Sequence, residues 1–123
     1  VQEAYVMRAY IVMFEHHLQK DNHVAAQKAL KQLAVKYPDS QKAMFQVGSS
    51  IIATDDIEEK NLDLAIKCLI RSAELNEETG EHCYKLIADA KLMMGDRKGA
   101  IEASEKAIQY NPSYKKIQKL KKQ

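Results

Sequence analysis

The segment GDRKGAIEASEKAIQYNP, residues 95–112, has the sequence features of one helix together with both of its ends. Asp96 can accept a hydrogen bond from the first helical turn, and Pro112 cannot continue a helix. Between them, apolar residues recur every three or four positions, as on one face of a helix. Similar segments begin near Asp21 and Asn61, so the chain contains an internal repeat that determines its fold.

The length of this repeat can be measured at two landmarks, a small residue inside each unit and the residue that ends each unit. The small residues are Ala26, Ala65 and Ala100, and the unit ends are Pro38, Glu77 and Pro112. Both sets have spacings of 39 and then 35 residues. We assign the longer spacing to an insertion of about five residues that includes residues 57–60, between the two helices of the second unit.

Each unit has apolar residues at helical spacing in two successive segments, which predicts a pair of helices. The predicted helices are residues 2–19, 23–36, 40–53, 61–75, 80–94, 97–110 and 113–123. The side chains that can cap their starts are Asp21 or Asn22, Ser40, Thr79, Asp96 and Ser113. Gly and Pro together number only six of 123 residues, about half the usual share, which leaves few turns for a β-sheet fold. We therefore expect one all-α domain over residues 1–123.

Small residues are expected where the paired helices touch. Ala26, Ala65 and Ala100 hold this place on the second helix of each unit. Gly48 and Ala88 hold it on the first helix of the second and third units. Small side chains allow a close approach of two helix axes, so a larger residue at these positions should overpack the pair.

Several positions of the units carry small, aromatic, aliphatic or proline residues in a recurring order. In the third unit they are Tyr84, Ile87, Ala88, Gly95, Asp96, Ala100, Ile101, Ala107, Ile108, Asn111 and Pro112. In the first unit they are Tyr10, Met13, Ala26, Leu30 and Pro38, and in the second Met44, Val47, Gly48, Ile51, Ala65, Leu69 and Ser72. This pattern resembles the tetratricopeptide repeat (TPR) family, whose unit is a helix–turn–helix of about 34 residues. The resemblance implies a right-handed α-solenoid of three helix pairs, with repeats at about 7–40, 41–79 and 81–114 and a capping helix at 113–123.

In the resembled family the first helices of successive units line a concave groove that holds an extended peptide or a helix of a partner. The groove residues, carried over position by position, are Arg8, Ile11, Glu15 and Leu18, then Lys42, Phe45, Ser49 and Ile52, then His82, Lys85, Asp89 and Leu92. The resemblance therefore implies a non-catalytic protein–protein interaction module that binds a protein or peptide partner.

The implied groove has an apolar centre with cations around it, which are Ile11, Phe45 and Ile52 and then Arg8, Lys42 and Lys85. Such a surface would fit a short peptide with one or two apolar side chains beside an acidic residue. The members of the family that bind the C-terminal carboxylate of chaperones have Lys and Asn where Ile11 and Glu15 stand, so that function is not favoured. Packing of the groove side chains against helices outside this chain is the alternative for the same residues.

Two other functions remain open from the sequence. The chain could be a structural spacer or self-association element, in which Tyr5, Val6 and Val12 contact a neighbouring repeat or a second copy. It could also be an accessory domain of an enzyme encoded elsewhere in the same protein. The start at residues 1–3, Val-Gln-Glu, has neither an initiator Met nor a signal-peptide pattern, so we interpret the chain as a piece of a longer protein.

No motif of the sequence predicts catalysis, a metal site, a cofactor or a small-molecule substrate. The four glycines are dispersed and form no phosphate-binding loop. His16 and His17 are neighbours and so diverge on a helix, as do His82 and Cys83, and neither pair predicts a metal or nucleophile site. The acidic cluster at residues 55–59 lacks the spacing of a calcium loop.

The net charge limits the classes of partner that the sequence indicates, and the cysteines indicate the redox compartment. The net charge of +2 comes from 19 Lys and Arg against 17 Asp and Glu, which is too small to indicate binding to nucleic acid or to a membrane surface. Five lysines at 113–123 are expected to form the solvent face of the capping helix. No apolar run approaches the ~20 residues of a membrane span. Cys68 and Cys83 are expected to be separate buried thiols, which favours a reducing compartment such as the cytoplasm.

Overall fold

The computed structural model describes residues 2–54, 59–111 and 113. Over these ranges the chain has six α-helices, one short 3-10 helix and no β-strand. The helices are α1 (Gln2–Gln19), α2 (His23–Lys36), α3 (Gln41–Ile52), α4 (Glu59–Leu75), α5 (Gly80–Met93) and α6 (Arg97–Tyr110), with the 3-10 helix η1 at Glu77–Thr79. The predicted all-α class is therefore confirmed.

The helix bounds agree with the prediction to within two residues, and the largest difference is at the start of α4. Helix α4 begins at Glu59, whereas the sequence prediction began it at residue 61 and placed residues 57–60 in an insertion. That assignment is wrong for residues 59 and 60, because Glu and Lys are strong helix formers and extend α4 backwards by half a turn. The predicted seventh helix at 113–123 lies outside the described residues except for Ser113.

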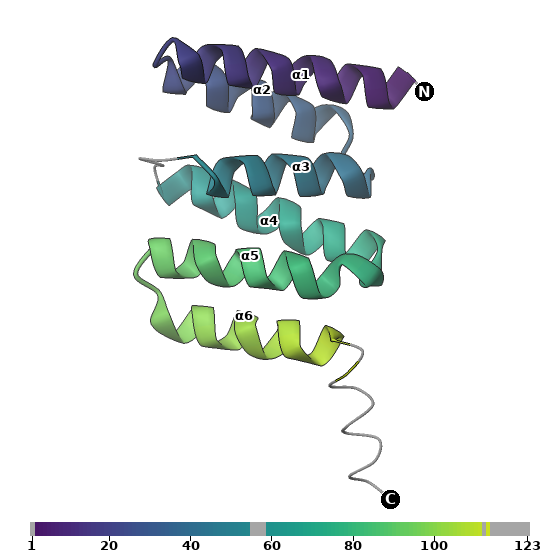
Figure 1. Cartoon of the computed structure of the whole chain (residues 1–123), viewed down its shortest axis with the longest axis vertical. Coiled ribbons are helices and arrows are strands. Elements are labelled where there is room, and N and C mark those ends of the chain that lie inside the picture. The colour runs from purple at the N-terminus through teal and green to yellow at the C-terminus, as the bar shows by residue number, and fades with distance from the viewer. Residues whose placement is uncertain (1, 55–58, 112, 114–123) are drawn as a thin grey trace, which may run out of the picture.

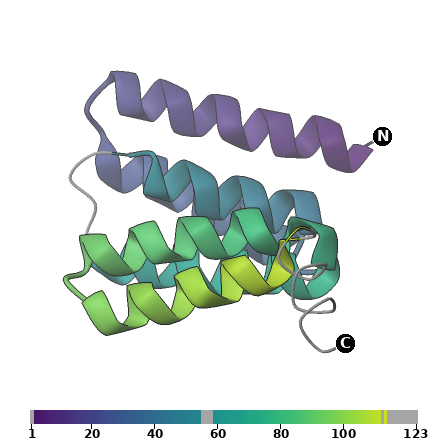
Figure 2. The same ribbon diagram turned by 60° about the horizontal axis from the view of Figure 1, so that its bottom comes forward.

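The helices follow one another along the long axis of the molecule as three antiparallel pairs, α1 with α2, α3 with α4, and α5 with α6 (Figure 1). Contacts within each pair are the most extensive, followed by those of α4 with α5 and of α2 with α3. Helices α1, α3 and α5 run in the same direction and lie one below another on the side that faces the viewer in Figure 1. The turned view in Figure 2 also has α1 at one end and α5 and α6 at the other.

The core consists of two apolar clusters that meet in the middle pair. One joins α1, α2, α3 and α4 through buried residues that include Phe14, Leu30 and Val47. The other joins α4, α5 and α6 and includes Leu69 and Ile87. Leu30, Val47 and Leu69 are 0 % exposed, and full burial of one such side chain stabilises a fold by about 1.5–3 kcal/mol. The apolar spacing read from the sequence thus forms continuous packing from α1 to α6.

The predicted small residues do lie at the helix contacts. Ala26 and Ala65 are 0 % exposed and Ala100 is 5 % exposed. A Cβ added to Gly48 of α3 would lie 2.5 Å from Cγ of Leu69 in α4, which is closer than real side chains approach. The close approach of α3 and α4 therefore depends on Gly48, as the sequence predicted.

The turns that join α1 to α2 and α5 to α6 have the same construction, 74 residues apart. Asp21 and Gly95 both have positive φ, 56° and 80°. In each turn the next backbone N–H donates to a carbonyl five residues earlier at 2.8 Å, from Asn22 to His17 and from Asp96 to Lys91. This hydrogen bond across a left-handed residue is a common way to end a helix.

Three of the predicted caps are present. The side chains of Asn22, Ser40 and Asp96 accept hydrogen bonds from the N–H groups of Ala25, Ala43 and Gly99. Thr79 was predicted to cap α5, and this is wrong. Its hydroxyl donates to the carbonyl oxygen of Asn76 at 2.7 Å, because η1 runs directly into α5 and Thr79 already has helical φ and ψ. None of the described helices is long and apolar enough to cross a membrane.

Candidate functional site

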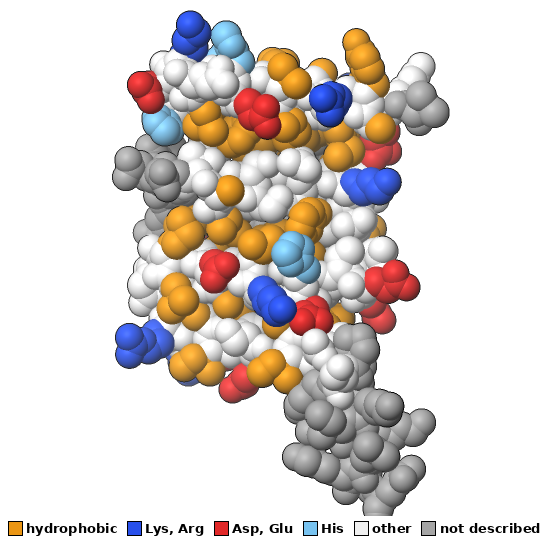
Figure 3. All heavy atoms as spheres, in the orientation of Figure 1, with side chains coloured by type: hydrophobic (Ala, Val, Ile, Leu, Met, Phe, Trp, Pro, Cys, Tyr) orange, Lys and Arg blue, Asp and Glu red, His pale blue; other side chains and the backbone are white. Residues whose placement is uncertain are grey.

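The predicted groove residues lie on three parallel helices of one face. Residues 8, 11, 15 and 18 of α1 have the helical spacing that places them along one side, and α3 and α5 repeat this spacing at residues 42–52 and 82–92. Figure 3 shows that side of the molecule, with apolar side chains gathered in bands between α1 and α3 and between α3 and α5. The face combines apolar bands with charged side chains of both signs.

Exposure divides the predicted groove residues into two groups. The exposed group is Arg8, Glu15, Lys42, His82, Lys85, Asp89 and Leu92, and the partly buried group is Ile11, Leu18, Phe45, Ser49 and Ile52. Ile11 and Leu18 pack against the first core cluster, Phe45 against the second, and Ile52 against both. The apolar residues of the face thus help to hold neighbouring helices together while part of each side chain stays accessible.

One aromatic contact joins predicted residues on two different pairs. The rings of Phe45 in α3 and His82 in α5 are stacked with centroids 5.2 Å apart and planes 29° apart. Exposed His82 covers part of Phe45, so the two rings form a single platform on the α3–α5 boundary.

The cations of this face differ in whether they form an ion pair with a described residue. Lys85 Nζ lies 3.0 Å from Oε1 of Glu81, one helical turn earlier on α5. Arg8 and Lys42 form no ion pair or hydrogen bond with any residue that the structure describes. The sequence prediction gave all three cations the same role at the rim of the groove. The structure leaves Arg8 and Lys42 as the cations available to a partner, whereas Lys85 is already paired.

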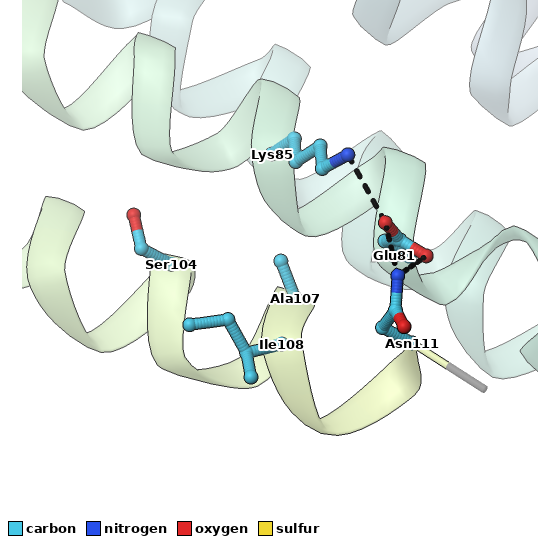
Figure 4. Close-up of a pocket in the computed structure, with 6 residues that line it drawn as sticks. All are labelled: Glu81, Lys85, Ser104, Ala107, Ile108 and Asn111. Atoms are coloured by element: carbon cyan, nitrogen blue, oxygen red, sulfur yellow. Dashed lines mark hydrogen bonds and ion pairs between the residues drawn. The ribbon is translucent and has the colours of Figure 1, made fainter. Parts of the chain in front are cut away.

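A pocket lies between α5 and α6, and the sequence did not predict it. This pocket has a volume of about 330 Å³ and is lined by Glu81, Lys85, Ser104, Ala107, Ile108 and Asn111 (Figure 4). The i, i+4 spacing of Glu81 and Lys85 is a local signal for their ion pair. The approach of Asn111 to Glu81 depends on how α6 crosses α5, which local periodicity does not specify.

The polar groups of this pocket satisfy one another. Asn111 Nδ2 donates to both carboxylate oxygens of Glu81 at 3.0 and 3.1 Å, and Lys85 binds the same carboxylate. The hydrogen bonds from Asn111 and then Lys85 lower the pKa of Glu81 below its ordinary value. Ser104 donates its hydroxyl to the carbonyl of Ala100 at 2.9 Å. The apolar residues of the lining are Ala107, which is 3 % exposed, and Ile108, which is 50 % exposed.

The cysteines are separate and buried, as predicted. Burial raises the pKa of the Cys68 thiol to about 11, so this thiol is protonated at neutral pH and is a poor nucleophile. Among the described residues, no group of three or more His, Cys, Asp and Glu side chains is arranged to hold a metal ion.

No protein-family model matches this chain, and a search of curated proteins gave no significant match. The resemblance to TPR repeats, the groove residues and the interaction function therefore remain predictions from the sequence.

Proposed function

We propose that this chain is a protein–protein interaction module without catalytic activity of its own. In this proposal it is a single domain of three TPR-like helix pairs in a right-handed α-solenoid, and residues 113–123 cap its C-terminal end. It holds a partner peptide or helix against α1, α3 and α5. The observation that carries the proposal is the alignment of these three helices on one face, with apolar bands between them. On the same helices, Arg8 and Lys42 form no ion pair or hydrogen bond with a residue that the structure describes.

The charges on this face indicate the chemistry of the partner. Because α1, α3 and α5 run in the same direction, Arg8 and Lys42 lie toward the same side of the face, nearer the helix N-termini. Glu15 and Asp89 lie further along α1 and α5, toward the other side. Helix N-termini also carry partial positive charge. A partner with an acidic residue over Arg8 and Lys42, followed by an apolar side chain against Phe45, fits this arrangement.

Fluorescence anisotropy with two synthetic peptides tests the proposal. One short peptide places Leu and Phe between acidic residues, and the other replaces the acidic residues with lysines. We expect the acidic peptide to bind at least about tenfold more tightly, and Lys42→Glu to remove most of that preference. Lys28→Glu is the matched control, because Lys28 is exposed on α2, outside the face.

Phe45→Ala tests the apolar part of the same face. We expect it to weaken the acidic peptide by about tenfold or more, as for a central anchor residue. Phe45 also packs against the second core cluster, so its circular dichroism melt must be recorded alongside. Equal binding of both peptides, or equal losses in Lys42→Glu and Lys28→Glu, would contradict the proposed function.

A further inference from the structure

We call the contact between one helix pair and the next a joint. At both joints, the first helix of the later pair buries the same two positions. These are a small residue and an aliphatic residue four positions later, Ala43 and Val47 in α3 and Cys83 and Ile87 in α5. All four are 3 % exposed or less. Ala43 and Val47 belong to the cluster that contains residues of α2, and Cys83 and Ile87 to the cluster that contains residues of α4.

Helix α1 has the same two residue types in the same register, but both are exposed. The 74-residue spacing of the two turns relates Cys83 to Ala9 and Ile87 to Met13. Ala9 is exposed, and Met13 is 44 % exposed. Phe14 is the one buried residue of α1. Val12 and Tyr5, at 54 % and 77 % exposed, extend this surface. We call Tyr5, Ala9, Val12 and Met13 the first end face.

The opposite end of the molecule has the complementary surface. In α4, the residues Ile66, Leu69 and Ala73 are in the cluster that receives α5, and each is 8 % exposed or less. Their equivalents 35 residues later in α6 are Ile101, Ser104 and Ile108. All three are exposed, Ile101 by 54 % and Ile108 by 50 %. Ser104 and Ile108 also line the 330 Å³ pocket. We call Ile101, Ser104 and Ile108 the second end face.

We propose that the first end face of one copy of this chain binds the second end face of another copy, in the place that the proposed cap at residues 113–123 would otherwise take. We infer a second copy as the partner from the contact between α4 and α5 within one chain. There, a helix with a small residue at i and an aliphatic residue at i+4 packs on three residues of α4. The second end face has the equivalent three positions on α6. A head-to-tail contact leaves one free end face on each outer copy. Association is therefore open-ended and does not stop at a dimer.

Three residues make this contact weaker than the contacts between the helix pairs within one chain. Ser104 stands where Leu30 and Leu69 are fully buried, so less apolar surface is covered. In the same register Lys85 and Arg8 take the places of Phe45 and His82, which stack in the α3–α5 joint. The contact therefore lacks the aromatic stack of the α3–α5 joint. We expect association at high protein concentration.

Sedimentation equilibrium over a wide range of concentration tests the proposal with the full chain. The wild-type mass should rise above 14.0 kDa with concentration and pass the dimer value. Met13→Glu and Ile108→Glu should each remain monomeric alone. Because each variant keeps one intact end face, their equimolar mixture should form a dimer and nothing larger. Val24→Glu is the control, since Val24 is 81 % exposed on α2 outside both end faces.

A gain of association gives a second readout, and reversible association with an unchanged melting temperature distinguishes it from aggregation of misfolded chains. Ser104→Leu restores the leucine of the other two pairs and should lower the concentration of half-association by several-fold. Three results would overturn the proposal: a wild-type chain that is monomeric at every concentration, a mixture of the two Glu variants that stays monomeric, or association lost in Met13→Glu and kept in Ile108→Glu. The last result would indicate a symmetric contact between two α1 helices.

Discussion

The first and third helix pairs reach the same backbone arrangement with different side chains. Their turns share the left-handed residue, the closing hydrogen bond and the side-chain cap, yet one uses Asp21 and Asn22 where the other uses Gly95 and Asp96. A left-handed conformation is unstrained for Gly and costs energy for Asp. The hydrogen bonds of the turn, and not the identity of one residue, therefore preserve the register of the repeat.

The two pairs differ more in what joins their helices. In the third pair the Tyr84 and Tyr110 rings stack with centroids 5.7 Å apart, and Tyr110 also covers Gly80. The equivalents of Gly80 and Tyr110 in the first pair are Val6 and exposed Lys36, so this contact is absent there. The third pair thus has specific aromatic and polar contacts in addition to the apolar pattern that both pairs share.

Of the substitutions proposed here, Gly80→Val should lower the stability of the fold most, because it disrupts the contact between α5 and α6. A Cβ at Gly80 would overlap the Tyr110 ring, so the substitution must displace that ring from its stack on Tyr84. We expect a loss of about 1–3 kcal/mol, seen as a melting temperature lowered by several degrees. Val6→Ala makes a change of similar size at the equivalent position of the first pair and should cost less, because Val6 is only partly buried. An unchanged melt for Gly80→Val would mean that the ring contact does not distinguish the two pairs.

Substitution of the two left-handed residues, Gly95 and Asp21, tests whether the two turns are equivalent. Gly95→Ala forces an L-residue to a φ of 80° and should destabilise the fold by about 1 kcal/mol. Asp21→Gly relieves a non-Gly residue at a φ of 56° and should stabilise it by about 0.5 kcal/mol. Urea unfolding of both variants measures the two effects. Changes of the same sign would show that the turns are not equivalent.

Loss of the Glu81 carboxylate should change the stability of the fold least, and the size of this change should depend on pH. Because its pKa is lowered in the folded chain by Asn111 and Lys85, ionised Glu81 stabilises the fold above the unfolded value near 4.5. This stabilisation is lost as the pH falls through the lower, folded pKa. Between pH 6 and 3 the wild type should therefore lose more stability than Glu81→Gln. Parallel pH profiles of the two proteins would contradict the contribution of this cluster.

The features that the sequence predicts well are the local ones. Helix bounds follow from apolar spacing, from caps such as Asn22, Ser40 and Asp96, and from the shortage of Gly and Pro. The burial of Ala26, Ala65 and Ala100 follows from the repeat spacing alone. These features depend on residues within one helix or one turn, where periodicity and capping act directly.

The features that the sequence did not predict depend on contacts between elements. The cap at Thr79 failed because η1 supplies helical geometry before α5 begins. The Phe45–His82 stack and the pairing of Glu81 with Asn111 join residues more than 29 positions apart. Such contacts depend on how one helix is offset from the helix that it packs against. That offset is determined by packing of whole helices, so no local pattern reports it.

The most direct test of the interaction function is a nuclear magnetic resonance titration of the labelled chain with the acidic, apolar peptide. We expect the amide shifts to concentrate along α1, α3 and α5, with the largest changes near Arg8, Lys42 and Phe45. The amides of the exposed sides of α2 and α4 should change little. Shifts centred on α2 and α4, or no saturable shifts at all, would contradict the claim that this face binds a partner.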